Sequence, residues 1–142
     1  MKKRNCSKDD YPLYEKRPDL IYTPTGKGIN EINMDRVLSD KITPDDCKIS
    51  AGTLEYQAQI AESMGNWQIA DNFRRAAELT NIPDKRILEI YNLMRPFRST
   101  KKELLDIAEE LEKKYGATRN ANFIREAAEI YEKRELIKKI GE

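Results

Sequence analysis

The sequence contains no histidine and only two cysteines, Cys6 and Cys47. A chain without histidine lacks the commonest general base and the commonest metal ligand, and two cysteines so far apart form no zinc pattern. We therefore expect no metal site. A disulfide between the two cysteines stays open, although two free thiols in a reducing compartment are the favoured interpretation.

Long apolar runs and a charge imbalance are also missing. No apolar run approaches the ~20 residues that span a bilayer. The basic start, Met1 to Arg4, is followed by polar residues where a signal peptide has its apolar stretch. Lys and Arg number 26 against 25 Asp and Glu, so the net charge of +1 gives no overall field for nucleic acid. We expect a soluble, cytoplasmic protein that binds neither membrane nor nucleic acid; a local basic patch stays open.

The chain divides into two parts of different character. Prolines and glycines punctuate residues 1–49, with Tyr11, Tyr14 and Tyr22 between them, and only residues 33–40 favour a short helix. Such a segment buries little of its own surface, so we expect an extended arm that is disordered or lies across another protein. Residues 50–142 form the predicted helical domain.

The helical domain shows five amphipathic patterns with apolar residues three and four apart. The expected helices run from Ser50 to Gly65, Asn66 to Thr80, Pro83 to Arg95, Thr100 to Gly116, and about Arg119 towards Lys139. Ser50 and Asn66 are expected N-caps, Pro83 suits the first helical position, and Thr100 to Glu103 fits a capping box. No alternating strand pattern competes, so the predicted fold class is all-α.

Two segments of this domain are similar. Phe73 to Leu79 (FRRAAEL) aligns without gaps with Ile124 to Ile130 (IREAAEI), and an Ile-Ala-Glu precedes each. This similarity predicts two helical hairpins packed through alanine faces, with coincidence between Ala/Glu-rich helices as the open alternative.

The segment Arg95-Pro-Phe-Arg98 is the first candidate site. Two arginines can hold an anion bidentately. The favoured interpretation is a helix–helix corner, in which Arg95 suits a helix C-terminus and Phe97 fills the gap between helices. A contact with a partner protein is a third interpretation.

Other chemical motifs are weaker. Thr23-Pro-Thr-Gly-Lys-Gly28 lacks the spacing of a phosphate loop and predicts a turn. Glu109, Glu110 and Glu112 belong to a solvated helix face, and Asp45-Asp46 suit a first helical turn beside Pro44. No nucleophile–base pair and no carboxylate in a dry pocket is indicated, so catalysis by this chain alone is not expected.

Several strings together resemble the small (gamma) subunit of adenosylcobalamin-dependent glycerol and diol dehydratases. They cover about residues 10 to 136 in order: Asp10-Tyr-Pro-Leu13, Thr23-Pro-Thr-Gly-Lys27, Thr53-Leu-Glu-Tyr-Gln-Ala-Gln-Ile-Ala-Glu62, Asn72-Phe-Arg-Arg-Ala-Ala-Glu-Leu79, Arg86-Ile-Leu-Glu-Ile-Tyr-Asn92, Arg95-Pro-Phe-Arg-Ser99 and Arg125-Glu-Ala-Ala-Glu-Ile-Tyr131.

The resemblance implies a radical-dehydratase heterohexamer with two copies each of large (alpha), medium (beta) and small subunits. In such an enzyme the large and medium subunits bind adenosylcobalamin, and the small subunit is a helical, non-catalytic part. We therefore assign no catalytic, cofactor-binding or metal-binding residue to this chain. The arm with Tyr11, Tyr14 and Tyr22 is expected to wrap the large subunit.

The resemblance leaves two enzymes to distinguish. Small subunits of diol dehydratase tend to carry an extension before the Asp-Tyr-Pro-Leu string, associated with bacterial microcompartments, and here nine residues precede Asp10. We therefore favour glycerol dehydratase, which forms 3-hydroxypropionaldehyde, with propanediol (diol) dehydratase as the alternative. A helical adaptor protein without enzymatic role is the alternative from another class.

Overall fold

The computed structural model describes residues 5–139. These residues form seven α-helices and four short 3-10 helices; their only strand-like feature is an isolated antiparallel bridge between Tyr22 and Gly28. The all-α prediction is confirmed. The chain divides into two compact units, the first ending at Thr80 and the second beginning at Asn81.

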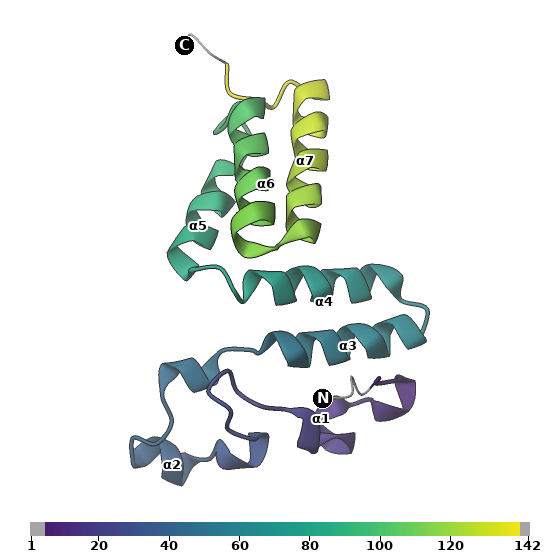
Figure 1. Cartoon of the computed structure of the whole chain (residues 1–142), viewed down its shortest axis with the longest axis vertical. Coiled ribbons are helices and arrows are strands. Elements are labelled where there is room, and N and C mark those ends of the chain that lie inside the picture. The colour runs from purple at the N-terminus through teal and green to yellow at the C-terminus, as the bar shows by residue number, and fades with distance from the viewer. Residues whose placement is uncertain (1–4, 140–142) are drawn as a thin grey trace. The chain divides into compact units, whose positions relative to one another are not determined.

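The first half of the N-terminal unit consists of short helices joined by turns (Figure 1). Its α-helices are α1 (Leu13–Lys16) and α2 (Met34–Leu38), and its 3-10 helices are Lys8–Asp10, Pro18–Leu20, Ile29–Glu31 and Pro44–Cys47. The short helix expected within residues 33–40 is α2. It begins where the Asn33 side chain accepts a 3.0 Å hydrogen bond from the Arg36 amide.

This segment packs against α3 (Ala51–Ser63) instead of standing apart from the helices. Cys6, Leu13 and Ile60 form a buried cluster, and Leu20, Ile21 and Tyr56 pack around it. The amide of Cys6 also donates a 2.8 Å hydrogen bond to Oε1 of Gln59. The compact unit therefore extends through α4 (Trp67–Leu79), whereas the sequence suggested a boundary after Ile49.

α3 and α4 form a helical hairpin. The Ser50 hydroxyl accepts the Thr53 amide at 3.2 Å, as predicted for an N-cap. Asn66 is the N-cap residue of α4, as predicted, but its side chain makes no capping hydrogen bond. Asn66 also belongs to the turn that closes α3: Gly65 is left-handed (φ 78°), and the Asn66 amide donates to the Ala61 carbonyl at 2.9 Å.

The C-terminal unit contains α5 (Asp84–Leu93), α6 (Lys101–Tyr115) and α7 (Thr118–Lys133). Pro83 precedes α5 with an extended ψ of 135°, so it is the N-cap rather than the first helical residue. The capping box between Thr100 and Glu103 is confirmed. Gly116 ends α6 in the left-handed conformation (φ 65°).

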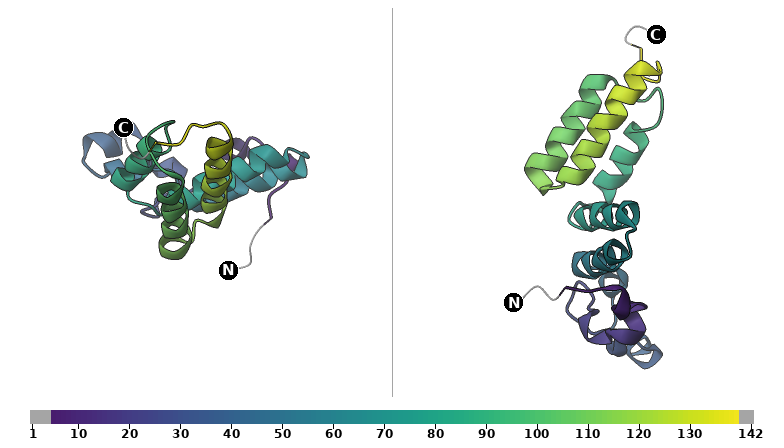
Figure 2. Two further views of the ribbon diagram at one scale, coloured as in Figure 1. Left: turned by 90° about the horizontal axis from the view of Figure 1, so that it is seen from above. Right: turned by 90° about the vertical axis from the view of Figure 1, so that its right-hand side faces the viewer.

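α6 and α7 lie side by side as a second hairpin (Figures 1 and 2). Alanines are buried in both hairpins: Ala58, Ala61 and Ala70 in the first, Ala108, Ala121 and Ala128 in the second. The two hairpins are as predicted, but of the aligned Ala-Ala pairs only Ala128 is buried, whereas Ala76, Ala77 and Ala127 are half-buried. α7 ends before the expected Lys139 because Glu135 turns left-handed (φ 56°). The Leu136 amide then donates to the Tyr131 carbonyl at 2.8 Å.

Candidate interaction surface

The turn from Thr23 to Gly28, whose sequence partly resembles a phosphate loop, is fixed by an ion pair with a buried carboxylate. Nζ of Lys27 lies 2.7 Å from Oδ2 of Asp46, and the carboxylate also accepts hydrogen bonds from Thr23, Thr25 and Thr43. The hydrogen bond from Lys27 is the main reason that the pKa of Asp46 lies well below its usual range. The turn is therefore occupied by a carboxylate of its own chain.

The predicted turn over Thr23 to Gly28 is confirmed, with Gly26 left-handed (φ 89°). The role of Asp46 was missed, since its partner stands 19 residues away in the chain. The spacing from Thr43 to Asp46 was an available signal, because both backbone and hydroxyl of Thr43 donate to Oδ2 of Asp46 in a capping box.

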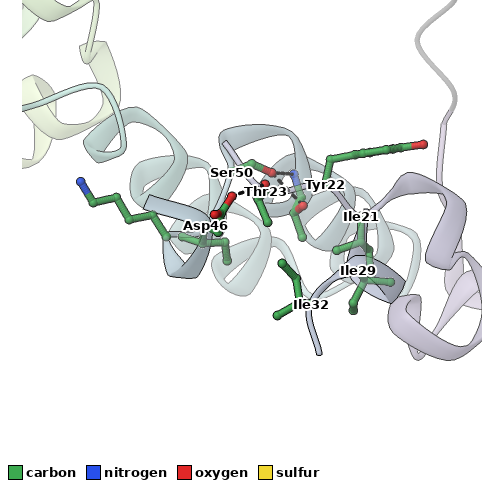
Figure 3. Close-up of a pocket in the computed structure, with 10 residues that line it drawn as sticks. Ile21, Tyr22, Thr23, Ile29, Ile32, Asp46 and Ser50 are labelled. Atoms are coloured by element: carbon green, nitrogen blue, oxygen red, sulfur yellow. Dashed lines mark hydrogen bonds between the residues drawn. The ribbon is translucent and has the colours of Figure 1, made fainter. Parts of the chain in front are cut away.

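Beside this ion pair lies a cleft of about 300 Å³. Its walls combine apolar side chains with hydroxyl groups: Ile21, Tyr22, Thr23, Ile29, Ile32, Asp46, Lys48, Ile49, Ser50 and Thr53. Figure 3 shows Ile21, Ile29 and Ile32 grouped on one side of Asp46, while the Tyr22 ring extends away from them. Because the Asp46 carboxylate is already neutralised, the cleft suits an apolar group better than a charged one.

Short helix α2 turns its apolar residues outward. Met34, Val37 and Leu38 are 69%, 45% and 77% exposed, and no residue of α2 is buried. Exposed apolar residues also lie at the cleft, and we name the set the arm surface: Tyr22, Ile32, Met34, Val37, Leu38 and Ile49. Tyr11 and Tyr14 are exposed as well. Grouped exposed apolar side chains mark sites of protein association.

The carboxylates of the helical hairpins are engaged in ion pairs. Arg74 on α4 binds Glu62 at 2.7 Å and Glu55 at 3.3 Å on α3. These three residues, with Cys6 and Trp67 among others, line a cleft of about 500 Å³. Burial raises the pKa of the Cys6 thiol, which keeps it protonated. Nothing in this arrangement provides a free base or nucleophile.

The acidic side chains of α6 are likewise paired instead of merely solvated. Arg86 of α5 binds Glu110 at 2.5 Å and lowers its pKa, and Arg125 of α7 binds Glu112 at 2.5 Å. Lys113 pairs with Glu109 along the same helix. Among residues 5–139 no three His, Cys, Asp or Glu side chains gather where they could hold a metal ion.

The corner Arg95-Pro-Phe-Arg98 does connect α5 with α6, but Phe97 does not fill the gap between helices. Its side chain is 60% exposed, so the expected packing role is wrong. The reason is the backbone, which is left-handed at Phe97 (φ 65°) and directs the ring into solvent. Arg95 and Arg98 are exposed too.

No helix in the described part of the chain is long and apolar enough to cross a membrane.

Comparison with known proteins gives the class of this protein. The family model described as dehydratase small subunit matches residues 6–138. The chain therefore belongs to the family of dehydratase small subunits.

Two curated relatives are similar over most of the chain. The propanediol dehydratase small subunit of Salmonella typhimurium is 49% identical, over 95% of this chain and 78% of the relative. The propanediol dehydratase small subunit of Citrobacter freundii is 50% identical, over 91% of this chain and 75% of the relative. Membership in this family confirms the resemblance seen in the sequence. The names of the two relatives do not support our expectation of glycerol dehydratase.

Proposed function

We propose that this chain is the non-catalytic small subunit of an adenosylcobalamin-dependent propanediol dehydratase, a hydro-lyase that converts propane-1,2-diol to propionaldehyde. The names of the two relatives, each about half identical in sequence, support propanediol over glycerol. Glycerol dehydratase, which the sequence analysis favoured, becomes the second candidate. The substrate pocket lies on another subunit in this proposal, so both candidates give this chain the same task.

The proposed partners are the large and medium dehydratase subunits, in a heterohexamer with two copies of each subunit. The family name supports a multi-subunit enzyme. Adenosylcobalamin is assigned to those larger subunits, because the two clefts described above fit it poorly. The wider one, about 500 Å³, has its carboxylates tied to Arg74, and the other is about 300 Å³ with apolar walls.

The arm surface is the observation that carries this proposal. A helix of five residues normally buries its apolar side, yet α2 leaves Met34, Val37 and Leu38 in solvent. The Lys27–Asp46 ion pair fixes the turn beside it, so the adjacent cleft is preformed. An exposed apolar surface beside a preformed cleft suits permanent contact with a larger subunit.

Reconstitution tests the proposal. The large and medium subunits are purified with and without this chain, and aldehyde formation is measured with adenosylcobalamin and either propane-1,2-diol or glycerol. We expect this chain to co-purify with the large subunit and to be needed for a stable complex that prefers propane-1,2-diol. A preference for glycerol would favour glycerol dehydratase over propanediol dehydratase. A chain that joins no complex would contradict the structural role and favour a free-standing adaptor.

A further inference from the structure

The backbone conformation of Phe97 is unusual. Among residues 5–139, the non-glycine residues with positive φ are Asp40, Phe97 and Glu135. Asp tolerates this region because its short polar side chain can bond locally, whereas a bulky aromatic residue there is strained. Strain of this kind persists only where the surroundings hold it, and it is concentrated at functional sites.

The surroundings do hold Phe97 in place. Its amide donates a 2.8 Å hydrogen bond to the Leu136 carbonyl, and the Lys138 amide donates to the Ser99 carbonyl at 3.0 Å. The Ser99 hydroxyl is buried and donates to the Leu93 carbonyl at 2.8 Å. The segment after α7 therefore holds the corner at Phe97 and again at Ser99.

The same hydrogen bonds leave the Phe97 side chain in solvent, where it packs little within its own unit. The neighbouring Arg95 and Arg98 are exposed, and neither guanidinium makes a hydrogen bond or an ion pair within residues 5–139. Aromatic residues and arginine are the residue types that contribute most binding energy at protein interfaces, and here an exposed Phe lies between two exposed arginines.

We propose that Arg95, Phe97 and Arg98 form a second docking point on the large subunit, separate in sequence from the arm surface. Phe97 would enter an apolar pocket of that subunit, and the two arginines would pair with carboxylates at its rim. Because Arg forms bidentate pairs with carboxylates, the expected rim of that pocket is acidic. This inference rests on the proposed function, which supplies the large subunit as the partner.

The Phe97→Gly variant separates docking from folding. Glycine adopts the left-handed region without strain, so the full-length variant is expected to melt at the same temperature as the wild type or higher. Its affinity for the immobilised large subunit should fall by roughly tenfold or more, as for a central interface aromatic. Unchanged affinity, or a lower melting temperature, would overturn the docking role.

A second pair of variants keeps the test independent of Phe97. The double variant Arg95→Ser/Arg98→Ser should bind more weakly, with the larger loss at low salt. The matched control, Lys113→Ser/Lys114→Ser, removes two exposed charges at the other end of α6 and should bind like the wild type. If the two double variants bind the large subunit equally well, the proposed contacts of Arg95 and Arg98 are wrong. Wild-type chain that fails to bind the large subunit would instead overturn the proposed function itself.

Discussion

Nζ of Lys27 lies 2.7 Å from Oδ2 and 2.8 Å from Oδ1 of Asp46, whose side chain has no exposed surface. The two residues come from separate turns of the N-terminal unit, and together they hold the segment that carries the arm surface.

Because of this ion pair, we expect substitutions of the adjacent residues Asp45 and Asp46 to change the melting temperature by different amounts. Asp46→Asn leaves the partly exposed Lys27 without its charge partner and weakens the hydrogen bonds to the buried carboxylate, so it should lower the melting temperature of the chain by several degrees. Asp45→Asn is the matched control, because the Asp45 side chain is 68% exposed and pairs with the exposed Lys48 at 3.1 Å. Thermal unfolding of both variants tests the difference, and equal melting temperatures would contradict it.

The ionised carboxylate of Asp46 should also make the stability of the chain depend on pH. The pKa of Asp46 is lowered in the folded chain from an ordinary value of 3.8. Its contribution is therefore complete above that pH and is lost as the pH falls towards the lower, folded pKa. The difference in melting temperature between wild type and Asp46→Asn should shrink as pH is reduced from 6 through about 4 towards 2. A difference that stays constant over this range would argue against an ionised Asp46.

The two hairpins offer a comparison of equivalent arginines. Arg74 bridges two carboxylates of α3, whereas Arg125 of α7 pairs with the single carboxylate of Glu112 and donates a 2.9 Å hydrogen bond to Oδ1 of Asn122. Partly exposed single pairs contribute little, so Arg125→Met should cost a few tenths of a kcal/mol and Arg74→Met about 1 kcal/mol. Urea unfolding of the two variants measures both changes. A larger loss for Arg125→Met would show that the shared network is not what stabilises the first hairpin.

The alanine packing between α6 and α7 predicts sensitivity to size. Ala128 has no exposed surface, so Ala128→Leu should overpack the hairpin and cost about 1–3 kcal/mol. Ala127, next to it and half-buried, is the control, and Ala127→Leu should cost less. Urea unfolding gives the two free energies, and a reversed order would be inconsistent with close packing through Ala128.

Sequence patterns predicted the longer helices well because each has an apolar periodicity and local caps. Ser50, Thr100 and Gly116 act as expected, since caps depend on residues within one turn. The end of α7 was missed because Glu135, rather than a glycine, takes the left-handed position.

The candidate surface was predicted only in part. Exposed Tyr11, Tyr14 and Tyr22 agree with an arm available to a partner, but α2 was expected only as a short helix. Its exposed apolar side depends on where the whole segment packs. The outward Phe97 and the Lys27–Asp46 pair also depend on tertiary contacts, which local patterns do not encode.

In the proposed function, the arm surface binds the large subunit. Leu38 is 77% exposed, so Leu38→Asp should leave folding unchanged while placing a charge in an apolar contact. Ser39→Asp, the neighbouring exposed position, adds the same charge without removing apolar surface. Titration of purified large subunit with the full-length chain should show binding weakened roughly tenfold or more by Leu38→Asp and much less by Ser39→Asp. If Leu38→Asp binds with wild-type affinity, the arm surface is not the site that binds the large subunit.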